Sequence, residues 1–280
     1  MNCNELAETW MERWPRPSTT SCSQYACTVR EWGEENSGIP LSDYTREQAR
    51  EYGLKHPSRV KPLRAMFFDA ERDGLVPGNP FSALRIAKPR KERYFPSTEE
   101  VQDIIRAAQE PLRGRIWFAA YVGPRLGEVL AMRPCDLSEP DWRSEPPCRA
   151  HLRWQMNAAN ERVGIKGKLK GYWATVPDEA RLGVAAAVDR TISDTDRLWP
   201  VTRAEHNKEW NALRRALKLP ENFVWHSLRH HAATWFLDQG ASFEDVAIQL
   251  GHSDNGQQVR DTYGHMSREK ALDRLEAVVS

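Results

Sequence analysis

The chain is poor in the features that define several large classes of protein. Its 5 cysteines among 280 residues are odd in number, scattered and without a CxxC pair. This excludes a disulfide framework and a zinc ribbon, and fits a reduced cytosolic protein. There is no apolar run of about 18 residues, so no membrane-spanning helix is expected. The sequence also lacks a GxxxxGK[ST] motif and an acidic cluster, so neither ATP nor a metal ion is expected as a cofactor.

The net charge is close to zero, because 40 Lys and Arg residues stand against 39 Asp and Glu residues. This average hides two locally basic stretches. Residues 84–93 (LRIAKPRKER) hold five basic residues and one acid, and residues 148–173 hold six basic residues and one acid. Each stretch fits either a solvated surface or a contact with an anionic partner.

Apolar spacing predicts a mostly helical chain. In the first part of the chain, helices are expected at residues 5–14, 19–32, 45–54 and 58–75. A further helix should begin after Ser97 or Thr98, either of which can act as its N-cap. Others are expected at 114–123, from Leu126 until Pro134 stops the helix, and again after residue 178. Three short segments between them, 149–156, 161–168 and 171–177, have the pattern of strands with polar turns. The proline-rich basic stretch after residue 75 breaks regular structure and is typical of a linker.

Residues 224–266 concentrate imidazoles and cations in sequence that is mostly helical. His226 and Arg229 are three positions apart, so they share one face of a helix. His226 and His230 have the spacing of a metal-binding helix, but the general-base glutamate of HExxH is missing and a guanidinium repels a metal ion. An anion is the natural partner, because the guanidinium fork matches phosphate oxygens.

A second candidate lies in YVGPRLGEVLAMRPCDL. Arg125 follows Gly-Pro at the beginning of a helix, where free backbone N–H groups also favour an anion. Glu128, three residues later, is placed to hold the guanidinium. A pair of this kind on its own is usually a surface ion pair.

The motifs GPRLGEVLAMRPCDL, HSLRHHAATWFLDQG, LGH and YGH, in this order, resemble those of the tyrosine recombinases, or phage-type integrases. The family has an arginine in a GxRxxE helix, a lysine in a β-hairpin, HxxRH, LGH and a nucleophilic tyrosine. The resemblance covers about residues 97–270. It implies a catalytic set made of Arg125, Lys168, His226, Arg229, His252 and Tyr263. Counting back from ATVP gives Lys168, with Lys166 and Lys170 as alternatives.

The resemblance implies a fold that is mainly α with a small antiparallel β-sheet. We expect a helical core-binding (DNA-clamp) domain at 1–84, a basic linker at 85–96, and an α+β catalytic domain at 97–280 that ends in a C-terminal helix. The preceding bundle agrees with the family's core-binding domain in size and position only.

The implied chemistry is strand cleavage through a phosphotyrosyl intermediate, without metal or ATP. Arg125 and Arg229 would clamp the non-bridging phosphate oxygens and His252 would add a donor. A tyrosine has a reference pKa of about 10, so Tyr263 needs help to ionise. His226 would accept or relay its proton, and Lys168 would protonate the departing 5′-oxygen. Glu128 and His230 are expected to support these groups.

The implied partner is double-stranded DNA, bound by a homotetramer on paired recombination sites in the cytoplasm of a prokaryotic cell. Phosphate contacts are expected from Lys88, Arg90, Lys91, Lys166 and Lys170. The C-terminal helix would dock either on a neighbouring subunit or on its own chain. Two other functions stay open: DNA relaxation by a tyrosine-type topoisomerase, and DNA binding by a non-catalytic integrase relative.

Overall fold

The computed structural model describes residues 1–13, 19–87, 92–138, 148–165 and 170–264. The chain forms two compact units, Met1–Lys91 and Glu92–Ser280. Residues 88–91 of the predicted basic linker lie outside the described part, as does the predicted C-terminal helix. None of the described helices is both long and apolar enough to cross a membrane.

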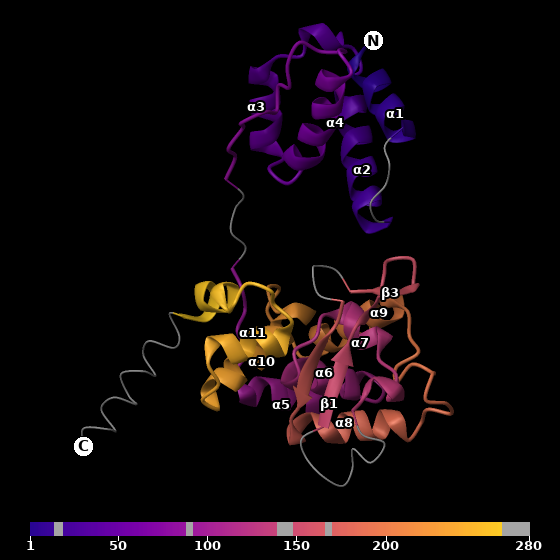
Figure 1. Ribbon diagram of the computed structural model, residues 1–280, viewed down its shortest axis with the longest axis vertical. Coiled ribbons are helices and arrows are strands. Elements are labelled where there is room, and N and C mark those ends of the chain that lie inside the picture. Colours follow the sequence, from indigo (N-terminus) through magenta and orange to yellow (C-terminus); the bar gives the residue numbers. More distant parts are fainter. Residues whose placement is uncertain (14–18, 88–91, 139–147, 166–169, 265–280) are drawn as a thin grey trace, which may run out of the picture. The chain divides into compact units, whose positions relative to one another are not determined.

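The first unit is a helical bundle (Figure 1), and its core is rich in aromatic side chains. Its described elements are α1 (Cys3–Arg13), α2 (Thr19–Glu35), the 3-10 turn η1 (Leu41–Asp43), α3 (Arg46–Lys55) and α4 (Val60–Arg72). The fully buried Trp32 packs edge-on against Tyr44 and Phe67, with ring centroids 5.1 and 5.3 Å apart. Its indole N–H also donates to the Tyr44 hydroxyl at 3.0 Å, so the burial of this ring leaves no polar group unpaired.

The second unit is also mainly helical. It contains α5 (Thr98–Ala107), α6 (Leu112–Tyr121), α7 (Leu126–Ala131), the 3-10 turn η2 (Pro134–Asp136), α8 (Asp178–Val188), α9 (Arg203–Ala216), α10 (Trp225–Asp238) and α11 (Phe243–Leu250). Residues 257–264 form a further helical segment. Ser97 is the N-cap of α5 and forms a capping box with Glu100. The helix that was predicted to stop at Pro134 stops earlier, at Ala131, because the backbone is already extended at Met132.

The strands form two antiparallel ribbons. β1 (Cys148–Leu152) pairs with β4 (Tyr172–Val176), with Cys148 opposite Val176 and Leu152 opposite Tyr172. β2 (Trp154–Met156) pairs with β3 (Arg162–Gly164). Alternate residues of β1 and β4 are buried, which is the pattern of a ribbon with one face on a core. The predicted strands are therefore present, divided between two sheets of two strands each.

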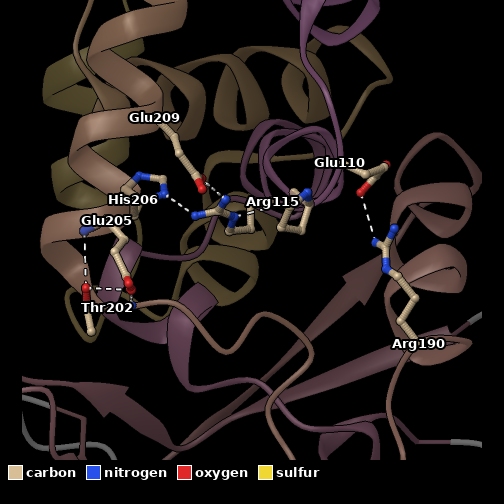
Figure 2. A network of polar contacts seen from close by, with 8 residues as sticks. Glu110, Arg115, Arg190, Thr202, Glu205, His206 and Glu209 are labelled. Carbon is tan, nitrogen blue, oxygen red and sulfur yellow. Dashed lines mark hydrogen bonds and ion pairs between the residues drawn. The ribbon is translucent and has the colours of Figure 1, made fainter.

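Helix α6 is central to this unit, because almost all of its residues are buried and it packs against both α8 and α10. It carries a fully buried arginine, Arg115, which is paired with Glu209 on α9 and donates to His206 Nδ1 at 2.9 Å (Figure 2). His206 in turn lies edge-on to Trp225, with centroids 4.3 Å apart. Trp225 is the first residue of α10, so this network fixes where the helix with the HxxRH motif begins.

Candidate active site

Arg125 stands at the beginning of α7 and is held by Glu128. Its backbone N–H donates to Glu128 Oε2 at 2.8 Å, and its Nη1 donates to Oε1 at 3.1 Å. The Tyr172 hydroxyl on β4 donates to the same Oε2 at 2.9 Å. Glu128 is 2% exposed and the Arg125 side chain is 47% exposed. The carboxylate thus orients the guanidinium, and because the Arg125 side chain is about half exposed, an anion can reach its other N–H groups.

Arg229, in the middle of α10, is almost fully buried, with 4% exposure. Its Nη1 donates to the Gly123 carbonyl at 2.7 Å, and its Nη2 donates to the Leu250 carbonyl at 2.8 Å. The same Nη2 lies 2.9 Å from His252 Nε2. Burial lowers the pKa of this arginine, and two carbonyl acceptors offset part of the cost of placing a cation there. Arg229 therefore ties together the loops that precede α7 and follow α11.

Gly123 has a local requirement that explains the GPR sequence. Its φ of +84° lies in the left-handed region, and a Cβ there would be 2.5 Å from Leu250 Cδ2 and 3.0 Å from Ala232 Cβ. Glycine is the residue that tolerates both the conformation and the close approach. The carbonyl of Gly123, which lies two residues before Arg125, can therefore accept a hydrogen bond from Arg229.

His252 follows the end of α11. Gly251 has a φ of +65°, and the His252 N–H donates back to the Ala247 carbonyl at 2.8 Å, which is a Schellman-type helix end. Because Nε2 accepts from Arg229, the proton of the neutral ring is assigned to Nδ1. Nδ1 is buried and has no hydrogen-bond partner within the described ranges. Burial, followed by the charges of Arg229 and Arg125, lowers the pKa of His252 to about 4.

Tyr263, in helical segment 257–264, is 4% exposed, and its hydroxyl lies 2.6 Å from Nδ1 of His230. Burial raises the pKa of Tyr263 to about 12, and the charges of Arg229 and Arg93 oppose this rise. Burial and then the charge on His226 lower the pKa of His230 to about 3. The resting pair is therefore a neutral phenol hydrogen-bonded to a neutral imidazole.

His226, which we expected to take the tyrosine proton, lies next to this pair. Its ring is edge-on to His230, with centroids 5.0 Å apart, and it is more exposed than His230. Partial desolvation, followed by the charges of Arg229 and Arg125, lowers the pKa of His226 to about 4. His230 therefore makes the direct contact with the phenol, and His226 lies against the ring of His230.

Most of the lysines and arginines that were predicted to contact phosphate lie outside the described residues. Lys168 and Lys166 lie outside the described residues, as do Lys88, Arg90 and Lys91 of the linker. Lys170 is described, and it is exposed just before β4. The choice among the three hairpin lysines therefore rests on the sequence.

The structure also adds residues that motif reading missed. Tyr172 is a buried donor to Glu128, and Gln249 on α11 links three backbone groups. The Gln249 side chain donates to the carbonyls of Val122 and Thr175 and accepts from the Thr175 N–H, at 2.9 to 3.0 Å. A polar residue directly before LGH was the available signal for Gln249, whereas nothing local marks Tyr172 as a partner of Glu128.

Other features of the unit lie apart from these residues. A cavity of about 800 Å³ is lined by four arginines (Arg133, Arg162, Arg190 and Arg197), two acids (Glu110 and Asp196), and neutral polar and apolar residues. It shares no residue with the group around Arg229. Among the described residues, no three His, Cys, Asp or Glu side chains come together in a way that could hold a metal ion.

The sequence matches known proteins over much of its length. A family model described as the phage integrase family matches residues 180–270. Tyrosine recombinase XerC of Agrobacterium fabrum is 27% identical over 202 residues, which cover 68% of this chain and 61% of that protein. A putative prophage phiRv2 integrase of Mycobacterium tuberculosis is 25% identical over 243 residues, or 76% of this chain and 59% of that protein. The chain thus spans about three fifths of the length of these relatives.

Solved structures share the fold. The Tn1549 transposon integrase in complex with circular intermediate DNA aligns with a TM-score of 0.77 at 14% identity, covering 98% of this chain and 99% of that chain. A lambda integrase dimer bound to a core site aligns with a TM-score of 0.67 at 17% identity, covering 91% and 96%. The predicted fold class, mainly α with a small antiparallel β component, is confirmed, and the β component is divided between two ribbons.

Proposed function

Because the chain belongs to the phage integrase family of tyrosine recombinases, we propose that it cleaves and rejoins DNA at specific sites through a covalent bond to Tyr263. The observation that carries this proposal is the convergence of separate chain segments around Arg229. The guanidinium contacts the loop before Arg125 on one side and His252 on the other, and its helix presents His230 to Tyr263.

In the proposed reaction, one DNA phosphate lies between the outward N–H groups of Arg125 and the Arg229–His252 pair. The non-bridging oxygens gain negative charge as the nucleophile attacks, and donors already fixed in place stabilise that charge with little reorganisation. Glu128 and Tyr172 fix Arg125, and the Gly123 and Leu250 carbonyls fix Arg229. His252, which lies 2.9 Å from Arg229 Nη2, would add a further donor.

The Tyr263 oxygen attacks phosphorus, the bond from phosphorus to the 5′-oxygen breaks, and a 3′-phosphotyrosyl link forms. The phenol proton passes to His230 and onward to His226. A bound phosphate offsets the positive charges that help to depress the pKa values of both imidazoles, so each becomes a better proton acceptor when DNA is in place. Lys168 gives a proton to the departing 5′-oxygen, which leaves as a hydroxyl, and the reverse sequence rejoins the strand without ATP or metal.

The proposed partner is double-stranded DNA, with Lys88, Arg90, Lys91, Lys166 and Lys170 at its phosphates. The related integrases were solved on DNA, including a lambda integrase tetramer on a Holliday junction. By analogy we propose a homotetramer on two paired sites, acting on DNA in the cytoplasm of a bacterial cell. Affinity for DNA should fall steeply as salt is raised, because each phosphate contact releases counterions.

A nicked suicide substrate tests the reaction, because cleavage near the nick releases a short strand and traps the covalent adduct. We expect the wild-type protein to form the adduct and Tyr263→Phe to form none while it still binds the DNA. Tyr94→Phe, which removes a hydroxyl that donates to Glu100 in the same unit, serves as the matched control and should keep the adduct. An undiminished adduct in Tyr263→Phe would rule out this nucleophile.

The same assay separates the other candidates. Relaxation of supercoiled plasmid without recombinant products would favour a topoisomerase, and binding without any adduct would favour a non-catalytic relative.

A second substrate tests which lysine protonates the leaving group. A substrate with sulfur in place of the 5′-oxygen needs no proton on its leaving group. Such a substrate should restore cleavage in the alanine variant of Lys168, and not in the variants of Lys166 and Lys170.

A further inference from the structure

The first residues of the second unit contact the helix that carries Tyr263. Arg93 Nη1 donates to the Thr262 hydroxyl at 2.9 Å. Thr262 is 9% exposed and directly precedes the tyrosine, so the bond fixes the turn that aims the phenol. In the sequence, Arg93 is one of the five basic residues of stretch 84–93, but in the structure its side chain donates to a protein hydroxyl.

Phe95 lies against both members of the phenol–imidazole pair. Its ring centroid is 5.1 Å from that of His230 and 5.7 Å from that of Tyr263, edge-on to the latter. It packs on the apolar cluster that includes Tyr263, Val259 and Leu250. The 2.6 Å contact between His230 and Tyr263 is therefore covered by the segment that opens the unit.

The opposite side of the same helix is held in a different way. Arg260 Nη2 donates to Glu244 on α11 at 2.6 Å, and both side chains are about half exposed. This pair does not contact the phenol or its histidine. The helix thus carries two arginine contacts, one beside the nucleophile and one remote from it, which provides an internal comparison.

We propose that Arg93 and Phe95 are positioning residues for the nucleophile: Arg93 acts through Thr262, and Phe95 acts by packing on the His230–Tyr263 pair. The inference rests on the proposed function, since it concerns the reactivity of Tyr263. The helix that carries Tyr263 needs such support, because residues 253–255, in the loop between α11 and this helix, are exposed and give it little packing. Because Arg93 and Phe95 lie within the predicted basic linker (85–96), this segment connects the proposed DNA contacts of the linker to the placement of the phenol.

A double-mutant cycle on the nicked substrate tests this coupling. Arg93→Ala and Thr262→Val should each slow single-turnover cleavage by about tenfold, the size expected from one hydrogen bond to a charged group, with DNA affinity unchanged. The double variant should be no slower than either single variant. Phe95→Ala should also slow cleavage. Arg260→Ala is the matched control and should cleave at the wild-type rate.

The pH profile of cleavage separates positioning from general loss of structure. The charged groups near the Tyr263 hydroxyl are Arg93 and Arg229, and the titratable ones are His226 and His230. The positive charge on Arg93 lowers the pKa of Tyr263, so Arg93→Ala should shift the rise of the profile to higher pH, and Arg93→Lys should restore it.

Additive losses in the double variant, an equal loss in Arg260→Ala, or slower cleavage that follows only from weaker DNA binding would each overturn the proposal. A wild-type protein that forms no adduct would instead overturn the proposed function itself, so the two failures are distinguishable.

Discussion

Replacing Gly251 with alanine tests the close approach that supports His252. The backbone φ is +65°, and a Cβ would lie 2.4 Å from Cε1 and 2.5 Å from Cδ1 of the Tyr172 ring. The ring is not free to withdraw, because its hydroxyl is bonded at 2.9 Å to the buried Glu128. The extra methyl group must therefore move either Tyr172 or the turn that begins at Gly251.

The expected cost has two parts. Left-handed backbone at a non-glycine residue costs roughly 1–2 kcal/mol, and overpacking of a filled site costs roughly 1–3 kcal/mol. The smaller entropy of the unfolded alanine chain returns about 0.4–1 kcal/mol. The free energy of unfolding of the second unit should therefore fall by about 2–4 kcal/mol.

Gly240→Ala is the matched control, because Gly240 has a φ of +92° and a Cβ there would meet nothing within 4 Å. It retains the backbone cost and lacks the overlap, so we expect a loss of about 1 kcal/mol. Urea denaturation followed by tryptophan fluorescence measures both variants. If Gly251→Ala is no less stable than Gly240→Ala, the close approach to Tyr172 is not a real constraint and the reasoning fails.

Two further predictions follow from buried groups. His206 is fully buried, and its pKa is lowered to about 3, chiefly by burial, whereas it is near 6.5 when unfolded. The unfolded chain therefore binds more protons between these values, and the free energy of unfolding falls as pH drops through this window, by about 1.4 kcal/mol per pH unit. His206→Gln keeps an acceptor for Arg115 and should remove that part of the slope, measured by denaturation from pH 4 to 7; an unchanged slope contradicts the assignment. Glu128→Gln removes the charge that orients Arg125 and should slow single-turnover cleavage several-fold; an unchanged rate would show that Arg125 needs no such support.

The parts of the fold that the sequence predicted are those with local causes. Ser97 was one of two candidates for the N-cap of α5, and its capping box with Glu100 depends on residues only three positions apart. The helices of both units follow apolar spacing, which local sequence displays directly. The division of the strands into two ribbons was not predictable in this way, because strand pairing depends on contacts between residues far apart in sequence.

The candidate site shows the same limit. Motif order indicated Arg125, Arg229, His252 and Tyr263, but it gave no reason to connect Tyr172 with Glu128 across 44 positions. Arg115 is a similar case. It lies in a segment that reads as an apolar helix, and only the packing of α9 shows that the guanidinium has Glu209 and His206 as partners. Buried polar pairs of this kind are set by tertiary packing.

The side chain of Gln249 has a consequence for the edge of the β1–β4 ribbon that β4 forms. Its amide meets both the N–H and the carbonyl of Thr175, as the peptide group of an adjoining strand would. A ribbon with an open border invites a foreign β-strand to add to it, which is a common route to aggregation. Because Gln249 occupies the N–H and the carbonyl of Thr175, an added strand could not pair with β4 at that residue.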